Sequence, residues 1–227
     1  MNYVEYGKEN KYDDNIFFQK YSQMSRSQQG LAGAGEWETL RKLLPDFKDK
    51  RVLDLGCGYG WHCIYAMEHG ASSVVGVDIS HKMLEVAKEK THFPQVEYKC
   101  CAIEDVEFPE ESFDVILSSL AFHYVADYEI LVKKIYRILK SGGKLVFTVE
   151  HPVFTAYGTQ DWYYNEKGEI LHFPVDNYYY EGKRTAVFLG EKVTKYHRTL
   201  TTYLNTLLSN GSVSYTHLRA HETSLHL

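Results

Sequence analysis

Two aspartates and three closely spaced glycines are the residues best placed to do chemistry. Asp54 directly precedes a turn with Gly56, Gly58 and Gly60, and Asp78 ends the next apolar run of the chain. Glycine lets the backbone approach a ligand closely and adopt positive φ. A helical pattern begins at once after the turn, and a helix N-terminus offers free N–H groups and a positive dipole end. The combination predicts a turn that binds a small molecule.

The elements that must position these residues alternate between strand and helix. Helical periodicity separates the apolar runs, and this alternation predicts an α/β fold with a doubly wound parallel sheet. Such sheets bind ligands at the carboxyl ends of their strands, which is where the glycine turn lies. The expected strands cover residues 51–55, 73–77, 96–100, 113–118 and 144–149.

The spacing of the glycines discriminates between ligands. A dinucleotide fingerprint is G-x-G-x-x-G, whereas here Trp61 follows Gly60 and the third glycine comes one residue early. The chain also has no G-x-x-x-x-G-K-[ST] phosphate loop. The glycine spacing therefore disfavours a nucleotide-dependent oxidoreductase.

The run D-L-G-C-G-Y-G at 54–60 resembles motif I of the class I S-adenosylmethionine-dependent methyltransferases. Three later segments extend the resemblance in the right order, and together they cover roughly residues 12–211. The similarity is to the small-molecule type, with a methyltransferase type 11-like domain, and it implies a Rossmann-like fold. The later segments are G-V-D-I-S at 76–80, the acidic run at 104–105 and F-D-V-I-L-S-S-L-A-F-H-Y at 113–124.

This resemblance implies that S-adenosylmethionine is the cofactor. Its ribose hydroxyls are donors, so Asp78 is expected to accept from both, while Asp54 either accepts from the ammonium group or ties down the turn. The adenine is expected close to Ile103, although Ala102 stands where many relatives carry an aspartate. The expected cofactor-binding residues are Asp54, Gly56, Cys57, Gly58, Asp78, Ile79, Ile103, Glu104 and Ser118.

Two segments outside the alternating unit are expected to flank the methyl acceptor. A helical apolar stripe within 14–25 precedes motif I and is expected either to fold over the cofactor as a lid or to pack on the core. The aromatic-rich stretch from 151 to about 195 predicts a small β-rich cap, with an oligomer contact or a surface flap as the alternative. The expected substrate contacts are Tyr21, Met24, Trp162 and His197.

Histidines are the candidate catalytic bases, because imidazole titrates near neutral pH. His151 follows the last strand and His123 follows the fourth, and Glu150 and His197 are also candidates for the acceptor site. The expected reaction is methyl transfer to an O, N or C nucleophile of a small organic molecule. The alternative is a non-catalytic module or sensor that binds S-adenosylmethionine. The four cysteines and the histidines show no zinc spacing, so no metal is expected.

Composition narrows the class of partner. The chain has 227 residues, 44% of them hydrophobic, and a net charge of −5. This balance disfavours a broad nucleic-acid-binding surface. No signal peptide or membrane span is recognised, so a cytoplasmic protein, monomeric or homodimeric, is expected. The expected division is a lid at 1–44 and a methyltransferase domain at 45–211, with the cap inserted at about 152–195.

The C-terminal segment departs from the family pattern. A helix is predicted over 196–210, after which members of the family have antiparallel edge strands. Residues 213–223 show neither strand alternation nor a cap, and they resemble the translation of a sequencing adapter. We therefore expect 212–227 to be a non-native tail on a C-terminally truncated chain that lacks its final antiparallel strands.

Overall fold

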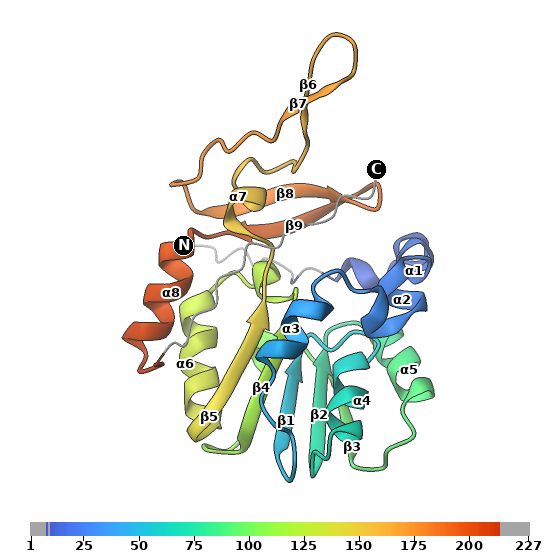
Figure 1. The fold of residues 1–227 in the computed structure, drawn as a ribbon, viewed down its shortest axis with the longest axis vertical. Coiled ribbons are helices and arrows are strands. Elements are labelled where there is room, and N and C mark those ends of the chain that lie inside the picture. Colours follow the sequence, from blue (N-terminus) through green and yellow to red (C-terminus); the bar gives the residue numbers. More distant parts are fainter. Residues whose placement is uncertain (1–7, 9, 214–227) are drawn as a thin grey trace, which may run out of the picture.

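A five-stranded parallel sheet forms the centre of the molecule, in the order β3-β2-β1-β4-β5. This computed structural model describes residue 8 and residues 10–213. The expected doubly wound α/β fold is confirmed (Figure 1), and the strand order reverses beside β1, where such sheets bind ligands. The strands are β1 (Arg51–Leu55), β2 (Ser73–Asp78), β3 (Val96–Cys100), β4 (Phe113–Ser119) and β5 (Leu139–Thr148).

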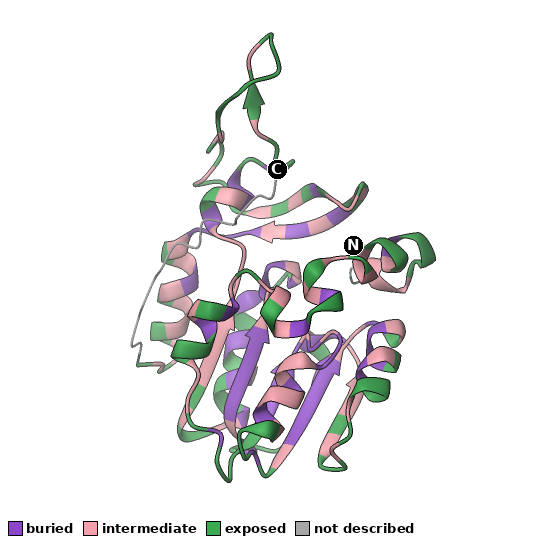
Figure 2. Cartoon of the chain, turned by 45° about the vertical axis from the view of Figure 1, so that its right-hand side comes forward, coloured by how far each residue is buried: buried purple, intermediate pink, exposed green. Residues whose placement is uncertain are grey.

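Helices cover both faces of the sheet because its central strands are apolar on both sides. Along β1, Val52 packs into the core under α4 and α5, whereas Leu53 packs into the core under α6. Figure 2 shows the central strands as buried. The helices are α3 (Trp37–Leu43), α4 (Trp61–Glu68) and α5 (His81–Lys90) on one face, with α6 (Tyr128–Ile138) and α8 (Leu200–Ser209) on the other.

The segment before the sheet docks at two places. Asp13 accepts hydrogen bonds from the Ser80 hydroxyl (2.6 Å) and the Lys82 backbone N–H (3.1 Å), at the start of α5. Phe17, fully buried, packs on Ala186 and Val193 of a later hairpin. The N-terminal segment is therefore fixed across the carboxyl edge of the sheet. Its elements are η1 (Lys11–Asp13), α1 (Asn15–Ser22), α2 (Ser25–Gln28) and η2 (Gly30–Gly33).

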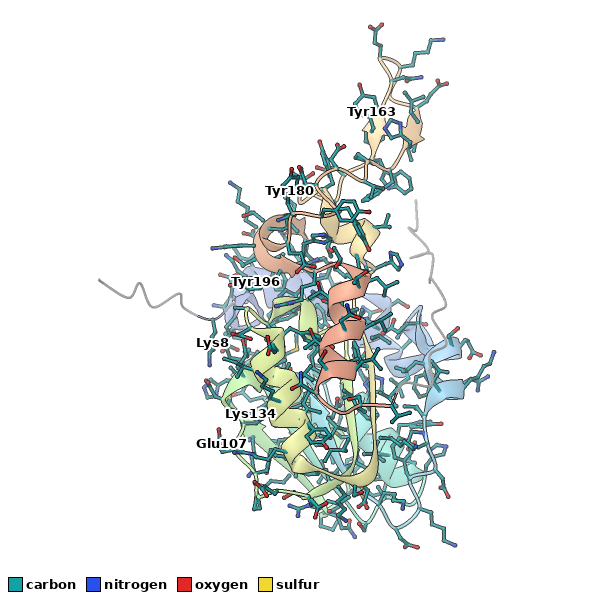
Figure 3. All side chains as sticks on the ribbon, turned by 90° about the vertical axis from the view of Figure 1, so that its left-hand side faces the viewer. Lys8, Glu107, Lys134, Tyr163, Tyr180 and Tyr196 are labelled. Atoms are coloured by element: carbon teal, nitrogen blue, oxygen red, sulfur yellow. The ribbon has the colours of Figure 1, made fainter. Side chains whose placement is uncertain are left out.

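Two hairpins and a short helix follow β5. The β8–β9 hairpin lies across the carboxyl ends of the sheet, whereas the β6–β7 hairpin projects away from the body (Figure 1). Tyr163, labelled in Figure 3, lies on this projecting arm and is 55% exposed. The elements are α7 (Pro152–Ala156), β6 (Tyr163–Tyr164), β7 (Ile170–His172), β8 (Gly182–Phe188) and β9 (Glu191–His197).

The prediction of a helix over 196–210 is wrong at its start. Tyr196 and His197 belong to β9, and α8 begins only at Leu200, with Thr199 as its N-cap. The side chains of Val193, Lys195 and His197 are all buried, which is the two-residue alternation of a strand.

Strand β5 marks one edge of the sheet, and among the described residues it pairs only with β4. Most of the tail that we expect to be non-native, 214–227, lies outside the described residues. No helix in the described part of the chain is long and apolar enough to cross a membrane.

Candidate active site

The glycine turn after β1 wraps around the carboxylate at the end of β2. Asp78 Oδ2 accepts from the Gly58 N–H at 2.8 Å, and Oδ1 accepts from the Ser80 N–H at 2.9 Å. Gly56 and Gly58 hold φ of 80° and 52°, which only glycine adopts without strain. Burial raises the pKa of Asp78, while the backbone N–H groups act in the opposite direction. Each carboxylate oxygen keeps a second lone pair with which it can accept from a ligand.

A cavity of ≈ 340 Å³ lies against this turn and Asp78. It brings together Gly56, Gly58, Asp78, Ile79, Ile103 and Glu104 from the expected cofactor set, and Tyr21 and Met24 from the expected substrate set. The N-terminal segment forms one wall and β8 contributes Phe188. The far end of the cavity is lined by His123, Tyr124, Val125 and Glu150.

Three residues of the expected cofactor set lie behind the cavity wall. Ser118 is buried, and its hydroxyl donates to the Leu55 carbonyl at 2.8 Å. Strand alternation turns Ser118 into the sheet, so Ser119 lines the cavity in its place. The Cys57 side chain points into the core under α4, and only its backbone belongs to the turn. Asp54, 1% exposed, lies below the turn.

Asp54 lies in an apolar environment, and few hydrogen bonds compensate its carboxylate for the loss of water. Its Oδ2 accepts from the Cys63 thiol at 3.5 Å, and its buried Oδ1 has no partner. Burial, more than the nearby Asp78 charge, raises the pKa of Asp54 to about 7. Its side chain lies on the core side of the turn, and neither carboxylate oxygen accepts from the turn in the described part of the chain. The expected contact with the ammonium group of the cofactor stays a prediction.

The free energy of unfolding is expected to fall with rising pH because of Asp54. A folded pKa of about 7 against an ordinary 3.8 means that the folded state binds the proton more tightly. This contribution is fully present below about pH 4 and lost as pH rises to about 7, and it amounts to about 4 kcal/mol. Urea unfolding at several pH values should show the loss in the wild type and not in Asp54→Asn. Parallel pH profiles for the two proteins would contradict the assignment.

A buried carboxylate, Glu150, occupies the far end of the cavity. The Lys195 ammonium and the Gln160 amide (2.8 Å) donate to its two oxygens, and Lys195 also donates to Gln160 Oε1 at 2.9 Å. Lys195 is only 3% exposed. Burial alone would raise the pKa of Glu150, but the Lys195 ammonium and these hydrogen bonds hold it below its ordinary value. Glu150 is therefore an ionised group on the cavity wall.

His123, one of the two expected bases, is brought to the cavity but faces Glu150. Its Nδ1 accepts from the Glu150 backbone N–H at 3.5 Å, and its Nε2 lies 3.9 Å from Glu150 Oε1. Burial lowers the pKa of His123 to about 4. The imidazole is therefore neutral near pH 7, with both ring nitrogens directed at one residue.

The other expected catalytic and substrate residues lie outside this cavity. His151 accepts from the Val153 N–H at 3.2 Å and caps α7. His197 is fully buried, with Nε2 donating to the Tyr178 carbonyl (2.8 Å) and Nδ1 bonded to the Thr155 hydroxyl (2.7 Å). Trp162 packs on Phe173 beside the projecting arm. Across the described residues, no group of three or more His, Cys, Asp or Glu side chains is placed to hold a metal ion.

Several cavity residues are absent from the expected cofactor and substrate sets. Arg26 of α2 pairs with Glu36, which also accepts from the Ser119 hydroxyl at 3.1 Å. Leu120, directly after β4, has a φ of 53°, a strained value for a side chain of this kind. The sequence signal for Arg26 is a charged residue directly after the apolar stripe of 14–25, whereas Leu120 is expected at the site because it directly follows the fourth strand.

Comparison with known proteins defines the class that this fold and cavity represent. Residues 53–147 match the family model described as a methyltransferase domain. A Listeria monocytogenes structure assigned to the S-adenosylmethionine-dependent methyltransferases is 59% identical, with 78% of this chain and 83% of that chain covered and a TM-score of 0.75. An S-adenosylmethionine-dependent methyltransferase from Mesorhizobium loti is 41% identical, with 80% and 83% covered and a TM-score of 0.74.

The chain belongs to the class I S-adenosylmethionine-dependent methyltransferases, and S-adenosylmethionine is its cofactor. A more distant relative is the ubiquinone biosynthesis O-methyltransferase of Coxiella burnetii, 36% identical over 112 residues, or 48% of this chain. The match spans only 47% of that relative's length.

The residues that line the cavity have the chemistry needed to bind this cofactor. The buried Asp78 carboxylate lies on the cavity wall and can accept from hydroxyl donors, and a Cβ added at Gly58 would meet no protein atom within 4 Å. The space in front of Gly58 is thus open for a ligand to meet the backbone. By contrast, a Cβ at Gly56 would come within 2.5 Å of the Ala121 Cβ, so this glycine lets the turn pack against the loop after β4.

Proposed function

We propose that this protein transfers a methyl group to an O, N or C nucleophile of a small organic molecule. The observation that supports it most is the continuity of one cavity, from the turn and Asp78 at one end to Glu150 and Tyr124 at the other. A site that only held the cofactor would not need a second, polar end. When bound, S-adenosylmethionine supplies a methyl group activated on a sulfonium.

The proposed roles of the residues follow from their chemistry. Asp78 accepts from the ribose hydroxyls while the Gly58 and Ser80 N–H groups hold its carboxylate in place. The adenine lies beside Ile103 and Glu104. Two cationic residues of the N-terminal segment, Lys8 and Arg26, line the cavity, and Arg26 pairs with the methionine carboxylate.

The flanking segments exclude water from the cavity in this proposal. The segment 1–44 acts as a lid and the insertion at about 152–195 as a cap on the domain at 45–211. Phe17 of the lid packs against Ala186 and Val193 of the cap, so the two segments meet above the cavity. A dry pocket favours methyl transfer, because charge is partly neutralised between donor and acceptor. The net charge of −5 disfavours nucleic acid as the acceptor.

The test is a transfer assay with S-adenosylmethionine carrying a deuterated methyl group and pools of small metabolites. We expect a deuterium-labelled product with the wild type and none with Gly56→Ala, whose new Cβ collides with Ala121. Binding of S-adenosylhomocysteine is measured in parallel by calorimetry. Tight binding without transfer to any pool would favour the non-catalytic module instead.

A further inference from the structure

Side chains from parts of the chain that are distant in sequence surround the Glu150 carboxylate. Glu150 itself follows β5, Gln160 lies in the loop after α7, and Lys195 comes from β9. His123, after β4, adds its Nε2 at 3.9 Å. Gln160 adopts a left-handed φ of 64°, which is rare for residues other than glycine. The cap thus holds the Glu150 side chain with a buried lysine and with a glutamine in an unusual backbone conformation.

This arrangement fixes what can lie beside Glu150 in the cavity. An ionised carboxylate only accepts hydrogen bonds, and two oxygens offer about four lone-pair sites. The Lys195 and Gln160 donors each take one of them. The oxygens therefore retain the capacity to accept from a ligand. A ligand group that contacts these oxygens must therefore be a hydrogen-bond donor.

Aromatic rings line the cavity that Glu150 borders, and the buried Lys195 ammonium lies 5.7 Å from the centroid of one of them, Phe188. Tyr12 and Tyr124 meet edge to face with ring centroids 6.4 Å apart, and Phe188 lines the same cavity. Burial raises the pKa of Tyr12 well above its ordinary value, so its phenol is neutral. The faces of such rings attract cations. Aromatic rings together with one carboxylate form the kind of surface that recognises an alkylammonium group.

From this geometry we infer that the acceptor is an amine, whose nitrogen binds between Glu150 and the rings of Tyr12, Tyr124 and Phe188. The inference rests on the proposed function and deepens it. An amine bound as its ammonium form first releases a proton to solvent, because only the neutral nitrogen has the lone pair that forms the new N–C bond. The S–C bond breaks with its electrons returning to sulfur, and the methylated nitrogen is left as an ammonium. Positive charge moves from sulfur to nitrogen during transfer. A carboxylate at the nitrogen end therefore stabilises the transition state more than the ground state.

The experiment compares two ligands of equal shape, choline and its neutral carbon isostere 3,3-dimethylbutan-1-ol. Each is titrated by calorimetry, or by ligand-observed NMR, into the full chain saturated with S-adenosylhomocysteine. We expect choline to bind at least about 10-fold more tightly than the isostere, which corresponds to about 1.4 kcal/mol. Equal binding of the two ligands, or tighter binding of the alcohol, would overturn the inference.

Two variants test whether the preference for choline arises at Glu150. The double variant Glu150→Gln/Lys195→Met removes both buried charges, so no lone charge is left in the core, and it is expected to lose the preference for choline. Glu129→Gln on the exposed face of α6, whose partner is Lys133, removes the same charge far from the cavity and should keep the preference. Unchanged preference in the double variant would also overturn the inference. If S-adenosylhomocysteine does not bind, it is the proposed function that fails.

Discussion

Replacing Asp78 with alanine is expected to raise the dissociation constant for S-adenosylmethionine by about two orders of magnitude or more. A hydrogen bond to a charged group contributes about 1.5–3 kcal/mol, and two ribose hydroxyls would each lose one. The carboxylate also holds the glycine turn through the Gly58 N–H, so its loss loosens the floor of the cavity. Calorimetry with S-adenosylmethionine and S-adenosylhomocysteine measures the change directly.

Asp176→Ala is the matched control, because Asp176 is exposed on the insertion and lies outside the cavity lining. Its affinity for both ligands should equal that of the wild type. The affinity of Asp78→Asn for S-adenosylmethionine should fall between that of Asp78→Ala and that of the wild type, since the amide retains one acceptor oxygen but lacks the charge. An Asp78→Ala protein that folds and binds S-adenosylmethionine with wild-type affinity would remove Asp78 from the proposed site.

The sequence predicted those parts of the site that depend on local backbone geometry. The Gly56 and Gly58 turn and Asp78 come directly after buried strands, and parallel pairing of β1 with β2 places them together. The strand starts at residues 51, 73, 96 and 113 were predicted correctly for the same reason. A continuous apolar run bounded by turn residues leaves little freedom in assigning a strand.

The direction of side chains at strand ends was not predictable with the same certainty. Ser118 and Ser119 are the same residue type in adjacent positions, and a shift of one residue moves a side chain to the opposite face. The prediction chose Ser118, which bonds the Leu55 carbonyl, while Ser119 faces the cavity. Only the register of β4 against its neighbours decides between them.

The far end of the cavity could not be assembled from the sequence because its contacts are long-range. Lys195 lies in a segment whose buried positions include a lysine and a histidine, so the alternation of β9 was hidden and a helix was predicted from Tyr196. The sequence marks Glu150 as a candidate for the acceptor site but does not indicate its partner. The partner is 45 residues away, and the β8–β9 hairpin brings it across the sheet.

The pairing of Lys195 with Glu150 is expected to dominate the stability of the cap. Breaking a buried ion pair leaves one charge without compensation and costs about 3–5 kcal/mol, whereas replacing both partners with neutral groups is often nearly neutral. Lys195→Met should therefore lower the free energy of unfolding by about 3–5 kcal/mol. Glu150→Gln should have a similar effect, because it leaves the Lys195 ammonium buried.

The double variant Glu150→Gln/Lys195→Met completes a thermodynamic cycle that separates the pair from its surroundings. Residues in contact usually show coupling of about 0.5–3 kcal/mol. For this buried pair we expect the coupling to exceed the cost of either single substitution, about 3–5 kcal/mol, because the double variant leaves no lone charge in the core. The double variant should thus be more stable than either single variant. Urea unfolding, followed by circular dichroism and by tryptophan fluorescence, measures all four proteins. Simple addition of the two single effects would show that Lys195 and Glu150 stabilise the cap independently, and it would remove the physical basis for treating them as one unit at the acceptor end of the cavity.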